Sequence, residues 1–435
     1  MELLDWQQLD SAARTAALAR PPATTSAEVV AQARDIIATV RRDGDAALRR
    51  YGLEFDGVEP DTLEVPAAEL AAAPEALSAE ARRALQIAVD NVTTFHAAQT
   101  PRELDVETQA GVRCERLLRP IQSVGLYVPA GSAPLPSTAI MLGVPARLAR
   151  CPQRILCTPA RADGKADPAV LTAAQLCGVT AIYKVGGAQA IAAMAYGTAT
   201  IPKVAKIFGP GNRWVTAAKQ LVAADADGAA LDMPAGPSEV MVIADDSADA
   251  DFIATDLLAQ AEHDPGAQAI LVTTSVPLAA AVQKRIEARL PGLSRREILL
   301  QSLRAARVVL VPDLAAAAEV AERYAPEHLL IQTRAPRALL PAISTAGSVF
   351  IGAWSPEPLG DYCSGTNHVL PTFGYARAYS GLSVSDFVRS MTVQELSADG
   401  LRALGPVAAT LARLEGLDAH AAAVDVRLDA LRLRA

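Results

Sequence analysis

Histidine is one of the scarcest residue types in this chain, with 5 among 435 residues, and aromatic residues make up only 4%. The sequence lacks an apolar run of about 18 residues and an N-terminal basic region followed by apolar residues, so we expect neither a transmembrane helix nor a signal peptide. Its 5 cysteines include no C-x-x-C pair. This spacing argues against a thiolate zinc site and favours reduced thiols in the cytoplasm.

Clustered positive charge is also missing from the sequence. The formal net charge is −8, the isoelectric point is near 5.3, and no basic run contains interleaved aromatic residues. Nucleic acids are bound through clusters of Lys and Arg, so we expect a small-molecule partner, and neither nucleic acid nor a membrane. Hydrophobic residues are abundant at 51%, and this fraction is sufficient for a large buried core.

The order of apolar runs predicts an α/β fold with two related Rossmann-like open sheets flanked by helices. Strand-like and helical segments alternate from Ser123 to Ser238 and again from Glu239 to Ile351, as is typical of parallel α/β units. Two Pro-Ala-Gly turns, at 129–131 and 234–236, are expected to be hinges. The predicted regions are an N-terminal helical segment (1–25), a main α/β domain (26–126 with 239–382), a second α/β domain (127–238) and a helical C-terminal tail (383–435).

The predicted tail is amphipathic but short. A helix of this kind does not bury its apolar face by itself, so we expect the tail to dock on the body of the protein or on another subunit. His420 also lies on the tail and, by pattern alone, is predicted to be a surface histidine. The apolar residues of the tail recur at helical spacing: Leu411, Leu414, Leu417, Val424, Leu428 and Leu431.

Four of the five histidines lie in short motifs that hold other side chains capable of catalysis, and only His96 has no such neighbours. Imidazole and carboxylate ligands that are distant in sequence but close in the fold suit a borderline ion such as zinc. A metal-assisted active site is therefore the first hypothesis. The four histidines are His263, His328, His368 and His420.

Gln260 and His263 form the first candidate metal pair. They are three residues apart, so they share one face of a helix, and Asp264-Pro265-Gly266 ends that helix directly afterwards. The alternative is a structural role in which His263 caps the helix C-terminus, where the helix dipole favours a positive charge. Spacing alone favours the structural role and leaves the metal pair open.

Glu327 and His328 follow a proline and begin a buried strand. An adjacent carboxylate and imidazole can serve as a general base for water and a proton relay, although a polar pair in an ordinary loop has the same pattern. The loop from Gly360 to His368 is rich in small polar groups, and there Asp361 can donate an oxygen ligand. His368 itself fits a structural hydrogen-bonding role, and we assign it no chemistry.

Two glycine turns each follow a strand and open a helix. They are Gly186-Gly187-Ala188-Gln189 and Gly209-Pro210-Gly211-Asn212. Exposed backbone N–H groups in such turns can receive a phosphate or another anion. The sequence has no G-x-G-x-x-G with an acidic residue about 20 positions later, so the nucleotide signal of these turns is weak.

Taken together, the motifs resemble those of the histidinol dehydrogenase family over nearly the whole chain. The resemblance implies an enzyme that oxidises L-histidinol in two successive NAD-linked steps, through L-histidinal, to L-histidine. It therefore strengthens the metal interpretation of the histidine motifs. The matching strings are Gly125–Gly131, Gly186–Ile191, Gly209–Asn212, Asp232–Glu239, Gln260–His263, Pro326–Leu329 and Ser364–Pro371.

The resemblance also implies a homodimer with shared active sites and one Zn²⁺ per subunit. The positions that match zinc ligands are Gln260, His263, Asp361 and, contributed by the partner chain, His420. The positions that match the acid/base pair are Glu327 and His328. Those that match NAD contacts are Tyr127, Gln189 and Asn212. Substrate contacts match the zinc ligands and the acid/base pair, together with Ser238 and Glu415.

Two other functions are alternatives on sequence grounds. A zinc hydrolase would use Glu327 to deprotonate a metal-bound water, but the chain has no H-E-x-x-H helix and has three strand–turn–helix candidates for a nucleotide site. A non-catalytic α/β binding protein would need neither Glu327 nor His328 for its function. NADH formation from histidinol separates the dehydrogenase from the hydrolase, and replacement of the acid/base pair tests the binding protein.

Overall fold

The computed structural model describes residues 1–20, 26–130, 133–234 and 236–433. Gly131 and Ala235, which belong to the two turns predicted as hinges, lie outside these ranges, as do residues 21–25 of the predicted N-terminal segment. The chain divides into two compact units. The first contains residues 1–99 and 122–387, and the second contains residues 100–121 and 388–435.

Six parallel strands form the larger sheet of the first unit, which we call sheet A. Their spatial order is β1, β11, β10, β9, β12, β13. From β9 the chain adds β10 and β11 on one side of that strand, and it then adds β12 and β13 on the other side. The strands are β1 (Glu2–Asp5), β9 (Glu239–Ala244), β10 (Gln268–Thr273), β11 (Arg307–Leu310), β12 (His328–Gln332) and β13 (Ser348–Ile351).

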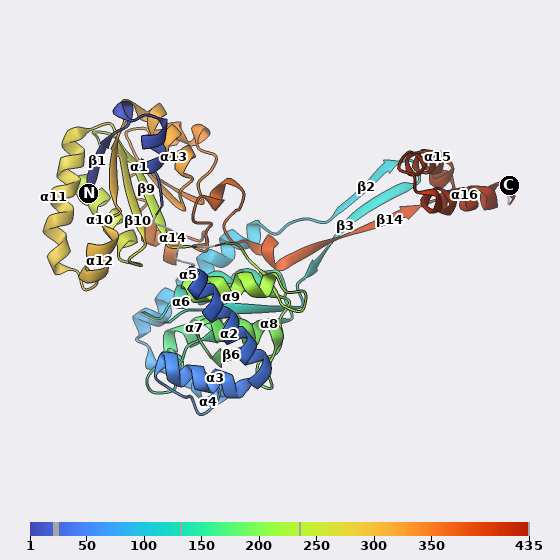
Figure 1. The fold of residues 1–435 in the computed structure, drawn as a ribbon, viewed down its shortest axis with the longest axis horizontal. Helices are drawn as coiled ribbons and strands as arrows, with labels where there is room; N and C mark the ends of the chain where they lie inside the picture. The colour runs from blue at the N-terminus through green and yellow to red at the C-terminus, as the bar shows by residue number, and fades with distance from the viewer. Residues whose placement is uncertain (21–25, 131–132, 235, 434–435) are drawn as a thin grey trace. The chain divides into compact units, whose positions relative to one another are not determined.

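Helices cover both faces of sheet A (Figure 1). Val240 of β9 packs into a core with α10, α11 and α12, whereas Met241 packs into a core with α1 and α13 on the opposite face. Because both faces are covered, every residue of β9 and β10 is buried, and these strands read as nearly uninterrupted apolar runs. The helices are α1 (Ser11–Ala17), α10 (Ala250–Ala261), α11 (Val276–Arg289), α12 (Arg296–Ser302) and α13 (Leu314–Tyr324).

A second parallel sheet in the first unit, sheet B, has the order β6, β5, β4, β7, β8. One of its cores includes residues of α2, α3, α8 and α9, and α6 packs against β4 and β5 with α5 and α7 beside it. The strands are β4 (Ser123–Tyr127), β5 (Gln153–Thr158), β6 (Ala181–Lys184), β7 (Lys206–Phe208) and β8 (Ala230–Leu231). The helices are α2 (Ala27–Asp43), α3 (Asp45–Tyr51), α5 (Ala79–Ala98), α6 (Pro136–Leu148), α7 (Pro168–Leu176), α8 (Gly187–Tyr196) and α9 (Arg213–Ala223).

Two segments of the chain pack in places that differ from the predicted regions. The predicted main domain includes residues 26–126, but Val29 of α2 and Leu48 of α3 lie in the core of sheet B with Ile191. The predicted helical segment 1–25 begins instead with β1, which pairs with β11 at the edge of sheet A and is followed by α1. Helical periodicity shows that a segment has an apolar face, but it does not show which sheet that face covers.

The second unit contains an antiparallel sheet, sheet C, and two helices. Its strand order is β14, β3, β2. The predicted all-helical tail is therefore wrong at its start, because β14 pairs with β3, a segment more than 250 residues earlier that the local pattern of β14 cannot reveal. The elements are β2 (Leu104–Gln109), β3 (Val112–Pro120), β14 (Val388–Leu396), α15 (Ala398–Leu414) and α16 (Asp418–Leu433).

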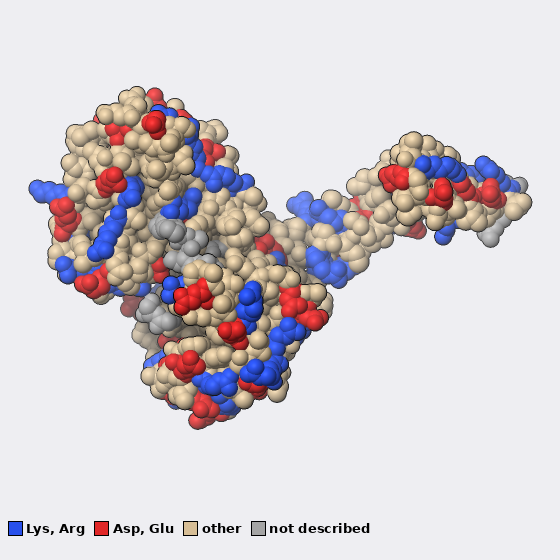
Figure 2. Space-filling view, viewed as in Figure 1, with Lys and Arg blue, Asp and Glu red and all other residues tan. Residues whose placement is uncertain are grey.

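The surface carries both signs of charge. On the face shown in Figure 2, Lys and Arg side chains alternate with Asp and Glu side chains over both units. Across the described ranges, no helix combines the length and the apolar composition that a bilayer crossing requires.

Candidate metal and catalytic site

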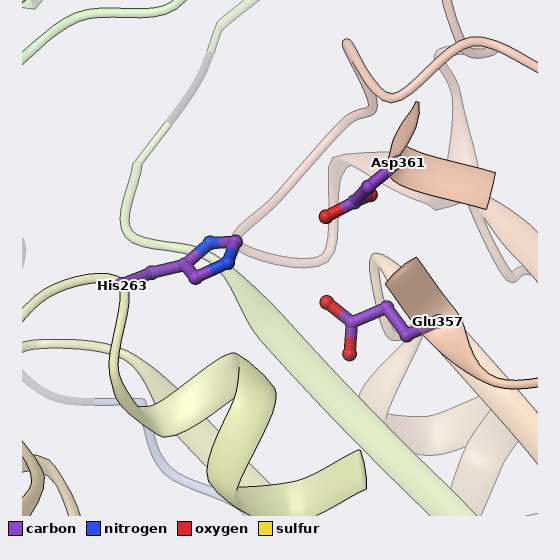
Figure 3. A group of neighbouring side chains, drawn as sticks. All are labelled: His263, Glu357 and Asp361. Carbon is purple, nitrogen blue, oxygen red and sulfur yellow. The ribbon is translucent and has the colours of Figure 1, made fainter. Parts of the chain in front are cut away.

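Two helices bring the candidate metal ligands together. Gln260 lies in the last turn of α10, and His263 follows the end of that helix. α14 (Glu357–Tyr362) carries Glu357 and Asp361, which are four residues apart and therefore on one helical face. His263, Glu357 and Asp361 point toward one another (Figure 3), and their ligand atoms lie within 4.8 Å of one another. This spacing suits a cation between them.

Gly360 allows α14 to approach sheet A closely. A Cβ atom at this position would lie 2.6 Å from the ring of Phe350 in β13, so a larger residue would push the helix away. The backbone carbonyl of the buried Asp361 lies 2.8 Å from Nδ1 of His368. The other ring nitrogen of His368 lies 3.4 Å from Oγ1 of Thr138. His368 thus has structural contacts that hold the Asp361 segment in place.

The acid/base pair lies at the amino edge of sheet A. Glu327 directly precedes β12, and His328 is its first residue, in register with Val240 of β9. α10 leads into β10, so its C-terminal end lies at this same edge and delivers Gln260 there. Ligands of open α/β sheets usually bind at the carboxyl edge, so the fold alone would have indicated the opposite side.

The backbone of Glu239 holds both members of the pair. Its N–H donates to Oε2 of Glu327 at 2.7 Å, and its carbonyl oxygen lies 3.1 Å from Nδ1 of His328. Glu327 and His328 are 5% and 3% exposed. Nε2 of His328 lies 3.5 Å from Oδ1 of Asp361 and has no hydrogen-bond partner within the described residues. The geometry therefore leaves this buried nitrogen available to a substrate.

Burial and mutual charge control the ionisation of this cluster. Burial raises the pKa of Glu327 to about 8 and the pKa of Glu357 to about 8, because a buried carboxylate is poorly solvated. Burial by itself lowers the pKa of His328, but the carboxylates of Glu327, Glu357 and Asp361 outweigh it and raise that pKa to about 10. A cation bound beside these groups would favour ionised carboxylates and a neutral imidazole, so it would lower these pKa values.

Glu357 is a site residue that none of the sequence motifs singles out. Its side chain is 1% exposed, and the side chain of Gln260 is 0% exposed. With the amide nitrogen of Gln260 oriented toward its acceptors, Nε2 lies 3.0 Å from Oε1 of Glu357. The signal in the sequence was the four-residue spacing between Glu357 and Asp361, which places both carboxylates on one face of a helix.

The three predicted NAD positions lie at the carboxyl edge of sheet B. Tyr127 ends β4, whereas Gln189 and Asn212 lie at the starts of α8 and α9, which follow β6 and β7. β4 is the strand at which the order of the sheet reverses, since β5 lies on one side of it and β7 on the other. Dinucleotides bind at such a switch point in open α/β sheets.

These three side chains differ in their local contacts. The N–H of Gly187 donates to Oη of Tyr127 at 3.0 Å. This hydrogen bond joins the turn that follows β6 to the end of β4. Gln189 is buried, and its Oε1 has no hydrogen-bond partner among the described residues. Oδ1 of Asn212 caps α9 by accepting from two backbone N–H groups at 3.1 Å each. Asn212 therefore has a structural role that leaves its Nδ2 for a ligand.

A buried ion pair fixes the turn that leads to Asn212. Gly209 has φ 122°, and a Cβ atom there would lie 2.2 Å from the carbonyl oxygen of Tyr127, so only glycine fits. The N–H of Gly209 donates to Asp232 at 2.8 Å, and its carbonyl accepts from Nζ of Lys219 at 2.8 Å. Lys219 and Asp232 form an ion pair whose side chains are 7% and 2% exposed.

The remaining predicted site residues lie in different units. Ser238 is partly buried and directly precedes β9, next to the residue that holds the acid/base pair. Glu415 and His420 belong to the second unit, where they flank the junction between α15 and α16, and both are exposed. The predicted metal and acid/base residues that the first unit brings together are Gln260, His263, Glu327, His328 and Asp361.

A family model described as histidinol dehydrogenase matches residues 19–428. The chain belongs to the histidinol dehydrogenase family. It is 52% identical over 431 residues to histidinol dehydrogenase of Vibrio parahaemolyticus, with 99% of each chain covered. It is 55% identical over 428 residues to that of Xanthomonas campestris pv. campestris, with 98% of this chain and 99% of the relative covered.

A solved histidinol dehydrogenase has the same fold. The crystal structure from Elizabethkingia anophelis is 41% identical to this chain, with a TM-score of 0.94 and 99% of each chain covered. The α/β architecture predicted from the alternating apolar runs is thereby confirmed. Family membership also confirms the resemblance drawn from the motifs and the oxidoreductase class that it implies.

Proposed function

We propose that this chain is a zinc- and NAD-dependent L-histidinol dehydrogenase, acting in the cytoplasm. It oxidises L-histidinol through L-histidinal to L-histidine, the end of histidine biosynthesis. The observation that carries the proposal is the convergence of Gln260, His263 and Asp361 beside the buried pair of Glu327 and His328. Family membership supports the reaction class.

The residues present fit a zinc ion. His263 offers an imidazole nitrogen, Asp361 a carboxylate oxygen and Gln260 an amide oxygen, and zinc accepts nitrogen and oxygen ligands of these kinds. When bound, zinc would supply the positive charge that orients the imidazole and amine of histidinol. We assign a fourth protein ligand to the partner subunit's His420, as the motif resemblance implies.

His328 is the proposed base for the alcohol. Its Nδ1 faces the carbonyl oxygen of Glu239, so a proton on Nδ1 is held there and Nε2 is left to accept the alcohol proton as hydride leaves for NAD. This role requires a neutral ring. The pKa of about 10 that surrounding carboxylates impose on His328 must therefore fall when positive charge enters the cluster.

Glu327 is the proposed base for the second oxidation. The N–H of Glu239 holds Oε2 of Glu327, so Oε1 can accept a proton from the water that attacks the aldehyde. The resulting hydrate then loses the second hydride to NAD. Retention of the aldehyde beside this buried pair between the two steps would limit the loss of a reactive intermediate.

A homodimer with shared sites is part of the proposal. In α15, which ends just before Glu415, Leu411 and Leu414 are 55% and 78% exposed. In α16, which carries His420, Val426 is 62% exposed. Exposed apolar side chains favour burial against another protein surface. We assign that surface to a second copy of this chain.

The proposal is tested by an NADH assay with L-histidinol, run beside a zinc assay of the purified protein. We expect NADH to form, and we expect His328→Gln to lower kcat by about 10²- to 10⁴-fold while zinc is retained. Zinc-loaded protein that forms no NADH would contradict the dehydrogenase. Hydrolytic activity lost in Glu327→Gln would then favour the zinc hydrolase.

A further inference from the structure

Three N–H groups hold the carboxylate of Glu239. Nε and Nη2 of Arg20 donate to its two oxygens at 2.5 and 2.9 Å, and the backbone N–H of Phe373 donates to Oε1 at 2.9 Å. The side chain of Glu239 is 3% exposed. A carboxylate this deeply buried is costly unless it is paired and hydrogen-bonded, and a two-point guanidinium contact also fixes its orientation. The side chain of Glu239 is therefore held in a single position.

Arg20 is itself fixed by the C-terminal end of α13. Its Nη2 also donates to the carbonyl oxygens of Tyr324 and Ala325, at 2.8 and 3.2 Å. Its Cζ lies over the Tyr324 ring, 3.9 Å from the ring centroid. The carbonyl groups at a helix C-terminus and the face of an aromatic ring both attract a positive charge. The guanidinium of Arg20 is therefore a rigid anchor for Glu239.

The backbone next to Arg20 is attached to sheet A as well. The carbonyl oxygen of Ala19 accepts from Nε2 of Gln268 at 3.3 Å, and Oε1 of Gln268 accepts from Oη of Tyr324 at 2.8 Å. Gln268 begins β10 and is in register with Glu239, which begins β9. These contacts deliver Arg20 to the amino edge of sheet A, the edge at which the acid/base pair lies.

Glu239 connects this anchor to the acid/base pair. Its side chain binds Arg20, while its N–H donates to Oε2 of Glu327 and its carbonyl oxygen faces Nδ1 of His328. All three contacts are made by one residue, so a rotation of Glu239 would displace both members of the pair. A displacement of about 1 Å at reacting groups can slow a reaction by about 100-fold.

We propose that Arg20 is a positioning residue that acts through the carboxylate of Glu239 and holds Glu327 and His328 in the geometry for proton transfer. The inference rests on the proposed function, because it takes these two residues as the bases of the reaction. Without Arg20, the carboxylate of Glu239 is buried without its cation. It regains solvation only by turning toward water, and this movement draws the backbone of Glu239 away from the pair.

The test measures NADH formation from L-histidinol by the zinc-loaded full-length protein. Arg20→Met removes the cation and its donors but keeps an unbranched side chain. We expect its kcat to fall by about 10- to 100-fold, because the bases are displaced. KM for L-histidinol and for NAD should stay within about twofold, because the substitution leaves the binding residues in place. Expressing kcat per bound zinc ion removes any contribution from protein that has not folded.

Arg14→Met is the matched control. Arg14 lies in the same N-terminal segment, where its Nε donates to the carbonyl oxygen of Trp6 at 3.2 Å and its Cζ lies 5.0 Å from the centroid of the Trp6 ring. It thus has an aromatic and a carbonyl contact of the same kind as Arg20, but its hydrogen bond ends at Trp6. We expect kcat of this variant to stay within about twofold of the unsubstituted value.

Two further measurements separate positioning from a purely structural role. Arg20→Ala leaves space for a guanidinium ion, so guanidinium chloride at a non-denaturing concentration should raise its kcat and leave Arg14→Ala unaffected. Arg20→Lys keeps the charge and should lose less kcat than Arg20→Met, and it replaces that variant if the latter does not fold. In a Glu239→Gln background, removal of Arg20 should have little further effect, because its route to the bases is already broken.

Four results would overturn parts of this scheme. Unchanged kcat in Arg20→Met would remove the positioning role. A rise in KM with loss of zinc, in place of a lower kcat, would show that Arg20 supports the fold and not the bases. Additive losses with Glu239→Gln would show that Arg20 does not act through Glu239. Absence of NADH formation by the unsubstituted, zinc-loaded chain would instead overturn the proposed function on which the inference rests.

Discussion

Oδ1 of Asp361 lies 3.5 Å from Nε2 of His328, so a proposed zinc ligand directly adjoins the proposed base. Asp361 comes from α14 and His328 from the start of β12, and both are buried. A positive charge bound by Asp361 would act on the imidazole at short range in a poorly solvated site. Metal binding and the protonation of His328 are therefore expected to be coupled.

We predict that zinc binding at about pH 8 releases a proton from His328. Without metal its pKa is raised to about 10, so the ring is protonated at that pH, and a nearby cation lowers the pKa and expels the proton. The release should vanish above about pH 10, where the ring is already neutral. Calorimetry of zinc binding in buffers of different ionisation enthalpy counts the protons.

The control for this prediction is His328→Gln. The difference between the two proton counts reports the loss of the imidazole together with the change that this loss causes in the neighbouring carboxylates, whose pKa values the His328 charge lowers. We expect the variant to release up to about one proton fewer. Equal counts for the two proteins would mean that the imidazole does not respond to the metal.

The shared-site dimer predicts complementation between two inactive variants. His263→Asn damages a ligand from the first unit, and His420→Asn damages one from the second unit, so each alone should lose zinc and activity. In mixed dimers one site would carry both substitutions and the other would be intact. Random subunit exchange should therefore restore about a quarter of the normal activity and zinc content.

This complementation is measured after co-expression or unfolding and refolding of the mixture. Mixing two variants that both affect the first unit, His263→Asn and Asp361→Asn, is the control and should restore nothing. If neither activity nor zinc content recovers in the mixture of His263→Asn and His420→Asn, each site is built from one chain.

We predict that Tyr127→Phe weakens NAD binding without disturbing the metal. The substitution removes the acceptor of the Gly187 N–H, which joins two turns at the predicted cofactor site. Loss of one such hydrogen bond is expected to raise KM for NAD about 3- to 10-fold while zinc affinity stays the same. Tyr183→Phe, another buried tyrosine of sheet B, is the control and should leave KM within about twofold.

We predict that Lys219→Met destabilises the first unit. It leaves the carboxylate of Asp232 buried without its cation, and it removes the donor to the carbonyl oxygen of Gly209. The free energy of unfolding in urea should fall by about 3 kcal/mol. Lys203→Met, at an exposed position, should change it by less than about 0.5 kcal/mol. Similar values for the two variants would show that the ion pair contributes little.

Local patterns in the sequence predicted correctly where several of the candidate site residues lie on helices and strands. Gln260 and His263 lie at the end of α10, as their spacing before Asp264-Pro265-Gly266 predicted. Glu327 and His328 lie at the start of a buried strand, as their position after a proline predicted. Such features depend on residues within a few positions of one another, so they can be read along the chain.

Other features depend on contacts between distant segments. The register of β14 on β3, the placement of α2 on sheet B and the approach of Glu357 to Gln260 each join parts of the chain that no local pattern connects. Glu357 illustrates the limit, because an isolated glutamate after a proline resembles an ordinary surface residue. The structure instead buries Glu357, in the helix whose Gly360 packs against Phe350.

The alternation of apolar runs and the family motifs were thus sufficient to establish the α/β class and the family of this protein, since both are properties of short segments. The tertiary structure decided at which edge of sheet A the acid/base pair lies. It also decided which carboxylate faces the Gln260 amide. Amphipathic periodicity specifies that a face will be buried, whereas the partner of that face depends on how all the elements pack together.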